Sequence, residues 1–263
     1  MNDFILGEEA YKTAKKSLSS LIKRSKEDKN ERTAINLIIN IKIQLVKTKD
    51  YKPRIIPITN KLDEPTNKSI LLITKDPSNI YRDELTKKDC PTDDLFSDIY
   101  SFKKVKCDLR VQKFLPDVLG EIFYYKNKKV PFIIQMAKPN AKISTKSKEN
   151  KIKDNRCDAK YVKLQVDSIV ENTSYIPNSK GDCLNITIGY TDWKVNDLLV
   201  NLNDVVDYLI NDKYLPIGGI VKSLNNLGNV HVKTSESISL PVYVKSDEDG
   251  KDNGDENDSD FDF

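Results

Sequence analysis

The sequence contains a single histidine, His231, and this scarcity limits the chemistry open to it. Zinc-protease motifs, multi-histidine metal sites and most serine–histidine relays would all have to be built around this one residue. His231 stands between Val230 and Val232 in an alternating segment, on the polar side, which is typical of a surface position in a strand. The phosphate-binding patterns GxxxxGK[S/T] and GxGxxG are absent as well. We therefore expect no enzyme activity, no metal and no cofactor.

Closely spaced cysteines and long apolar runs are missing too. The chain has four scattered cysteines without a CxxC pair: Cys90, Cys107, Cys157 and Cys183. This spacing favours reduced structural thiols over a zinc ribbon or a disulfide framework. No window of about 18 consecutive apolar residues occurs, and the first residues lack the basic-then-apolar layout of a secretory signal. We expect a cytosolic or nuclear protein without a membrane partner.

Charge is distributed unevenly along the chain. Residues 246–263 hold nine acidic residues and one lysine, a net charge of −8. Since the whole chain has a net charge of +3, the remaining residues carry +11. A basic body with an acidic tail is typical of a protein that binds a polyanion. The tail itself is expected to be disordered, either tuning that binding or only adding solubility.

Hydrophobic periodicity predicts an amphipathic framework at both ends of the chain. Apolar residues recur at helical spacing in two segments, residues 8–24 and 192–212, and Asp192 is expected to cap the second helix. Alternation predicts strands with one polar face at 34–46, 161–170, 184–190 and 229–235. The segment 53–59, with two prolines, suits a sheet edge.

The middle of the chain has a different texture. Residues 69–77, SILLITKDP, form a nearly continuous apolar run, which predicts a strand covered on both faces. Further elements are expected as a helix near 78–87, a strand-like patch at 99–105, a helix at 110–123 and a strand at 130–136. Residues 138–156 are polar, lysine-rich and aperiodic, as in a linker or exposed loop.

The different hydrophobic patterns of the chain ends and the middle predict an α/β protein of two domains. Residues 1–65 and 160–245 would form one discontinuous α+β domain, and residues 66–137 an inserted three-layer α/β domain. Residues 138–159 would be a basic linker and residues 246–263 the acidic tail. A single continuous sheet is the alternative.

Lysines occupy the polar faces of three predicted strands, at Lys42, Lys163 and Lys233. If the strands share a sheet, its open face would combine lysine with Asn, Gln, Thr and Ser, a set suited to RNA backbone and sugar hydroxyls. An ordinary solvated face fits the same spacing.

Several motifs, taken in order, resemble the ribosomal L1-domain family: INLIINIK, PRIIPIT, SILLITKDPS, DLRVQKFLPDVLG, KKVPFIIQM, NTSYIPN, LNITIGY and HVKTSESISLPVY. Within that family the chain is most similar to the fungal Utp-type ribosome biogenesis factors of the small-subunit processome. The resemblance covers about residues 8–244. It implies an L1-like fold of a split domain with a Rossmann-like insertion, non-catalytic binding of ribosomal RNA, and a nucleolar or nuclear location. Implied partners are pre-ribosomal RNA, other assembly factors and ribosomal proteins, without a small-molecule substrate.

The resemblance also suggests what the segment after residue 232 does. Ribosomal members usually have a threonine, methionine, glycine signature against RNA at this place, whereas this chain has Thr234, Ser235 and Glu236. Loss of the glycine removes a close backbone approach, and the carboxylate repels phosphate. The implied RNA contacts are Lys233, Thr234, Ser235 and Ser237. For the function of the whole protein, the alternatives to an RNA-binding assembly factor are a protein-docking scaffold or a large-subunit stalk protein.

A second departure concerns the inserted domain. Relatives usually have a further helix and buried strand where KKVKCDLRV runs straight through, so the domain is expected to be one βα unit short. Removal of a strand from a parallel sheet exposes edges.

Overall fold

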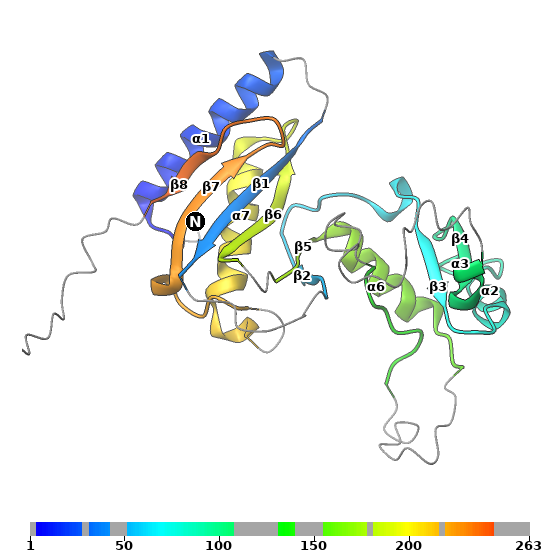
Figure 1. Cartoon of the computed structure of the whole chain (residues 1–263). Helices are drawn as coiled ribbons and strands as arrows, with labels where there is room; N and C mark the ends of the chain where they lie inside the picture. The colour runs from blue at the N-terminus through cyan, green and yellow to red at the C-terminus, as the bar shows by residue number, and fades with distance from the viewer. Residues whose placement is uncertain are drawn as a thin grey trace, which may run out of the picture.

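The computed structural model describes residues 4–27, 32–42, 52–107, 131–139, 155–177, 181–215 and 219–244 (Figure 1). The helices are α1 (Glu8–Glu27), α2 (Asn79–Leu85), α3 (Phe102–Cys107), α6 (Ala159–Glu171) and α7 (Val195–Ile210). The strands are β1 (Ala34–Ile41), β2 (Arg54–Ile56), β3 (Leu71–Thr74), β4 (Asp98–Ser101), β5 (Thr173–Tyr175), β6 (Cys183–Tyr190), β7 (Leu227–Lys233) and β8 (Leu240–Tyr243). The mixed α/β class is confirmed. The predicted helix at 110–123, most of the 138–159 linker and the tail from 246 lie outside the described residues.

The largest sheet joins the two ends of the chain. Its strand order is β6-β1-β7-β8, with every neighbouring pair antiparallel. In β1 the predicted alternation is realised, since every second residue from Ile35 to Ile41 is almost fully buried. The side chains between them therefore share the opposite face of the sheet.

Helices α1 and α7 pack against each other and against the buried face of this sheet (Figure 1). Both are amphipathic: α1 buries Ala14, Leu18 and Leu21 on one stripe, and α7 buries Leu202 and Leu209. The two helices and the sheet enclose one continuous apolar core. Among the described residues no helix is both long and apolar enough to span a membrane.

A second, smaller core lies in the middle of the chain. Strands β3 and β4 pair in parallel, and their buried residues Leu72 and Ile99 contact Leu85 of α2. Val162 and Val166 of α6 complete this core. The expectation that the 69–77 strand is covered on both faces was wrong, because Leu71 is 39% exposed.

The predicted strand at 161–170 was also wrong, because these residues form most of α6. Val162 and Val166 are four residues apart, a spacing that places both on one helix face as readily as on one strand face. The side chain of Asp158 accepts hydrogen bonds from the backbone N–H groups of Lys160 and Tyr161, which caps the first turn. The cap and the second core together favour the helix.

Three further expectations were corrected. Of the predicted strand at 130–136, the described residues from 131 onward form no strand; the side chain of Gln165 accepts a hydrogen bond from the backbone N–H of Gln135 instead. Asp192 does not cap α7, because Lys194 stands at the N-cap position. Asp192 lies in the preceding turn, with one carboxylate oxygen 3.6 Å from Nε of Arg32. Of the patch at 99–105, the first residues belong to β4 and the rest to α3.

Candidate nucleic-acid interface

The face of the large sheet that α1 and α7 do not cover, here called the uncovered face, is mostly polar along its central strands. The register places Lys233 opposite Asn36, and His231 opposite Ile38. On the other side of β1, Thr187 lies opposite Asn36 and donates a hydrogen bond to its side-chain oxygen at 2.9 Å. These side chains all belong to the strand positions that are not buried in the core. The face therefore offers hydroxyl, amide and ammonium groups to a ligand.

Two of the three predicted lysines belong to this sheet region. Lys233 ends β7, whereas Lys42 follows β1 and its backbone N–H donates to the carbonyl of Asn226 at 2.8 Å. Since Lys233 pairs with Asn36, six residues along β1 separate the two lysines, or roughly 20 Å. The sheet thus carries one lysine near each end of β1.

Lys163 lies elsewhere. It belongs to α6, next to Val162 of the second core, and does not share a sheet with Lys42 and Lys233. The expectation of three lysines on one sheet face is corrected on this point, because the segment that carries Lys163 is a helix.

The loop after β7 is closed by a reciprocal pair of hydrogen bonds. The backbone N–H of Thr234 donates to Oγ of Ser237 at 2.8 Å, and the backbone N–H of Ser237 donates to Oγ1 of Thr234 at 3.1 Å. Thr234 is only 6% exposed, whereas Ser235 and Glu236 are exposed. The hydroxyls of Thr234 and Ser237 therefore shape the loop, and Ser235 stands at its solvent side.

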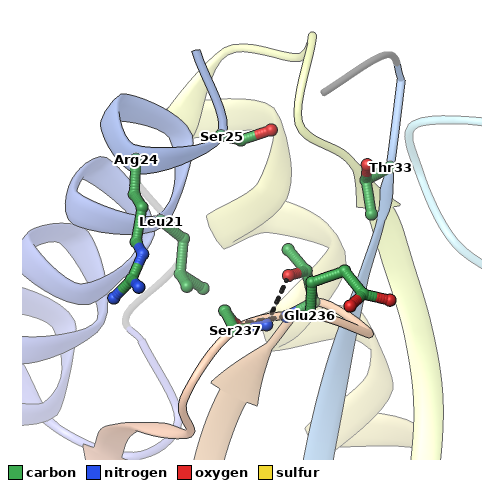
Figure 2. A pocket seen from close by; sticks show the side chains of 7 residues that line it. Leu21, Arg24, Ser25, Thr33, Glu236 and Ser237 are labelled. Atoms are coloured by element: carbon green, nitrogen blue, oxygen red, sulfur yellow. Dashed lines mark hydrogen bonds between the residues drawn. The ribbon is translucent and has the colours of Figure 1, made fainter. Parts of the chain in front are cut away.

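This loop lies against the end of α1 and the start of β1. A cavity of about 40 Å³ separates them, lined by Leu21, Arg24 and Ser25 of α1, by Thr33, and by the loop (Figure 2). Such a volume holds a few water molecules but not a nucleobase. A ligand at this end would contact the outer surface of the loop and not enter between it and α1.

A cluster that sequence reasoning missed ties the start of β1 to the segment after β2. The carboxylate of Asp63 accepts a hydrogen bond from the Tyr190 hydroxyl at 2.7 Å and lies 2.9 Å from Nζ of Lys68. The guanidinium of Arg32 stacks 3.9 Å from the centre of the Tyr190 ring. The sequence did not predict this cluster, because its residues lie far apart along the chain. The pairing of Ala34 with Tyr190 brings them together.

The pKa values of this cluster follow from its contacts. Burial alone would raise the pKa of Asp63, but hydrogen bonds from Lys68 and Tyr190, with the charges of Lys68 and Arg32, outweigh burial and lower it. Burial, followed by the hydrogen bond to Asp63, raises the pKa of Tyr190 to about 12. The cluster is therefore held by a charged carboxylate and a neutral phenol at neutral pH.

The remaining reactive groups show no constellation within the part of the chain that the structure describes. His231 lies on the uncovered sheet face opposite Pro241 of β8, as predicted. Burial, with nearby acidic charge as a smaller cause, raises the pKa of the Cys157 thiol to about 11, so this thiol stays protonated at neutral pH. The described residues contain no group of three or more His, Cys, Asp or Glu side chains placed to hold a metal ion.

Comparison with known proteins gave two findings. Residues 15–238 match the model of the ribosomal protein L1p/L10e family. The chain is also 38% identical over 258 residues to the ribosome biogenesis protein UTP30 of Saccharomyces cerevisiae, covering 89% of this chain and 90% of that protein.

Proposed function

The chain belongs to the ribosomal protein L1p/L10e family, and from this premise we propose that it is a non-catalytic, RNA-binding factor of ribosome biogenesis. Membership confirms the resemblance that the motifs carried, and it agrees with the mixed α/β, L1-like fold. The observation that carries the RNA-binding part is the uncovered, polar face of the β6-β1-β7-β8 sheet, flanked by Lys42 and Lys233.

The domain division is part of this proposal. The large core draws on both ends of the chain, and the small core draws on residues between β3 and α6. We assign the large core to a discontinuous domain and the small core to an inserted domain. Because Val162 and Val166 pack in the small core, we place α6 with the inserted domain, so that the return to the first domain follows α6 and not residue 160.

The sheet face suits irregular or single-stranded RNA better than a regular duplex. Lysines near each end of β1 are spaced to meet phosphates along one strand of RNA, and Asn36, Thr187 and Ser235 offer hydrogen bonds to sugar hydroxyls or base edges. The exposed Glu236 opposes close phosphate approach at the loop. We therefore assign Lys233 and Ser235 to direct contact, and Thr234 and Ser237 to the shape of the loop.

The finer role that we propose is in early small-subunit pre-ribosomes, in the nucleolus or nucleus. Pre-ribosomal RNA, other assembly factors and ribosomal proteins would be the partners. The similarity to a ribosome biogenesis protein over nearly the whole chain supports this role over that of a large-subunit stalk protein. The Ser235–Glu236 departure from the stalk signature supports it as well.

A charge-reversal series tests the RNA surface. Lys42→Glu and Lys233→Glu should each weaken binding of a labelled pre-rRNA fragment several-fold and lower the salt dependence of binding by about 0.7 to 0.9 per lost phosphate contact. Lys15→Glu is the matched control, because Lys15 is an exposed residue of α1, which covers the opposite face of the sheet. Lys163→Glu asks whether the RNA extends to α6, and we expect a smaller effect there. Equal affinity of the Lys233→Glu, Lys42→Glu and control variants would refute the sheet face as the RNA surface.

The cellular role needs a separate test. Crosslinking of the tagged protein to RNA in cells, with sedimentation of the same extract, should recover precursor small-subunit rRNA from large early particles. Recovery of stalk RNA from mature ribosomes would instead identify a ribosomal protein. Particle association without RNA crosslinks would identify a protein-docking scaffold.

A further inference from the structure

A basin separate from the sheet face lies beside the N-terminal end of α7. It is an open depression with a volume of about 480 Å³. Six of its lining residues bear on its chemistry: Asn60, Lys61, Asp192, Trp193, Lys194 and Asp197. It is about ten times larger than the cavity behind the 234–237 loop. The basin combines one indole with lysines, carboxylates and a carboxamide.

The indole of Trp193 is held in place by its contacts with β6. A Cβ atom at Gly189 would lie only 2.7 Å from the Trp193 ring, so the absence of a side chain there lets the ring rest on β6. The Tyr190 ring packs edge-on against Trp193, with the ring centres 5.8 Å apart and the planes at 70°. Arg32 in turn stacks on Tyr190. Trp193 is therefore a fixed aromatic surface on one wall of the basin.

The part of the basin formed by Asn60 and Lys61 is fixed as well. The backbone N–H of Asn60 donates to Oδ1 of Asn201 at 2.9 Å, and Nδ2 of Asn201 donates to the Asn60 carbonyl at 2.8 Å. Nζ of Lys61 donates to the side chain of Asn172 at 2.8 Å. Because both parts of the basin are ordered by the protein itself, a ligand would bind without a large cost in conformational entropy.

The charges of the basin suit a nucleotide. Its lining has two lysines, Lys61 and Lys194, and two carboxylates, and Arg32 lies 3.6 Å from one of these, Asp192, and offsets its charge, which leaves a small positive excess. A base stacked on Trp193 would place its sugar and phosphate toward these lysines. The oxygens of Asn60 and Asp197 can accept hydrogen bonds from base N–H groups. Aromatic stacking beside basic residues is the usual arrangement for unpaired bases.

The basin and the 234–237 loop lie at the same end of the sheet. Tyr190 pairs with Ala34, and Lys233 pairs with Asn36, so the ends of β6 and β7 flank the start of β1. Strands that flank a common neighbour lie about 10 Å apart. This arrangement places the loop and the basin on strands that a single RNA strand of a few nucleotides is long enough to cross.

We propose that this basin binds one unpaired base of the RNA, stacked on Trp193, and the proposal rests on the RNA-binding function proposed above. The contact adds a preference for single-stranded over duplex RNA. It is independent of the charge contacts made by Lys42 and Lys233.

The full-length protein provides a direct reporter, because Trp193 is its only tryptophan. A labelled unstructured RNA of about 12 nucleotides is titrated while RNA anisotropy and tryptophan emission are followed together. We expect quenching of Trp193 by this RNA and not by a duplex of the same sequence. Trp193→Ala should weaken binding about 5- to 100-fold, whereas Trp193→Phe, which keeps a stacking surface and the fold, should stay within about threefold. Circular dichroism and the urea midpoint check that both variants fold.

Each outcome of this experiment supports or overturns the proposed base site. RNA binding seen by anisotropy with unchanged tryptophan emission, or with full affinity in Trp193→Phe and Trp193→Ala alike, would overturn the base site and leave the proposed function intact. Quenching by an arginine-rich peptide but not by RNA would overturn it in favour of a basic protein partner. Absence of RNA binding by anisotropy would refute the proposed function and the base site together.

Discussion

Residues 59–61, after β2, form a segment here called the strap, which Asn201 of α7 ties to β6 through its contacts with Asn60 and Ile188. Replacing Asn201 by leucine should loosen this connection. Asn201 is fully buried in α7. Its Nδ2 donates to the carbonyls of Asn60 and Ile188, both at 2.8 Å, and its Oδ1 accepts from the Asn60 N–H at 2.9 Å. Leucine has a similar volume, so the substitution removes hydrogen bonds without opening a large cavity.

The magnitude follows from the groups left unpaired. Three backbone groups lose their partner, at about 1 to 3 kcal/mol for each group that stays buried. Asn60 is only partly buried, so water can replace some of its loss, and the total is about 3 to 6 kcal/mol. Burial of the leucine side chain offsets about 1 to 2 kcal/mol. We expect a net loss of about 2 to 4 kcal/mol, a large share of the 5 to 15 kcal/mol typical of a folded domain.

Urea unfolding followed by tryptophan emission measures the free energy of unfolding of the large core, because Trp193 packs against the same core as α7. Asn196→Leu is the matched control: it makes the same change at an exposed position of the same helix and should alter the free energy of unfolding by less than about 0.5 kcal/mol. A loss below about 1 kcal/mol for Asn201→Leu would refute the view that this side chain holds the strap.

Two further predictions concern the neighbouring cluster and strand. Because the pKa of Asp63 is lowered in the folded protein, its contribution to stability is present above its ordinary value of 3.8 and is lost as the pH falls through the lower folded value. The wild type should therefore exceed Asp63→Asn in urea resistance at pH 7 and lose that advantage progressively as the pH falls below 3.8. A difference that does not change with pH would contradict the charged contact with Lys68. Gly189→Ala should destabilise the protein by about 1 to 3 kcal/mol and shift Trp193 emission, since the new Cβ overlaps the indole; unchanged unfolding and emission would show that the ring is free to move.

Periodicity was a sound guide where one side of an element meets the core. The helix at 8–24 and the strands at 34–46, 184–190 and 229–235 were predicted because their alternation is long and regular, and the structure has α1, β1, β6 and β7 there. Segment 161–170 was assigned wrongly because Val162 and Val166 fit both periods. Contact with the second core, whose other buried residues lie between Leu72 and Ile99, favours the helix.

The candidate site was predicted unevenly for a similar reason. The polar positions of β1 and β7 follow from alternation, and so do the uncovered side chains of Asn36, His231 and Lys233. The separation of Lys163 from them could not be predicted, because it depends on the type of one element. The basin around Trp193 gave no sequence signal, since its walls come from residues 59–61 and 192–197, which only the strap brings together.

The sequence by itself determined the local pattern: which faces are apolar, where lysines accompany amides and hydroxyls, and, through its motifs, the L1-like family. Tertiary structure decided which of those faces stay open and which distant side chains meet. Helices α1 and α7 cover one side of the sheet and leave Lys233 on the other, and the pairing of Ala34 with Tyr190 assembles Arg32, Asp63 and Trp193 at one end. The physical reason is that periodicity reports burial along a single element, whereas a site is made by contacts between elements, whose partners no local pattern specifies.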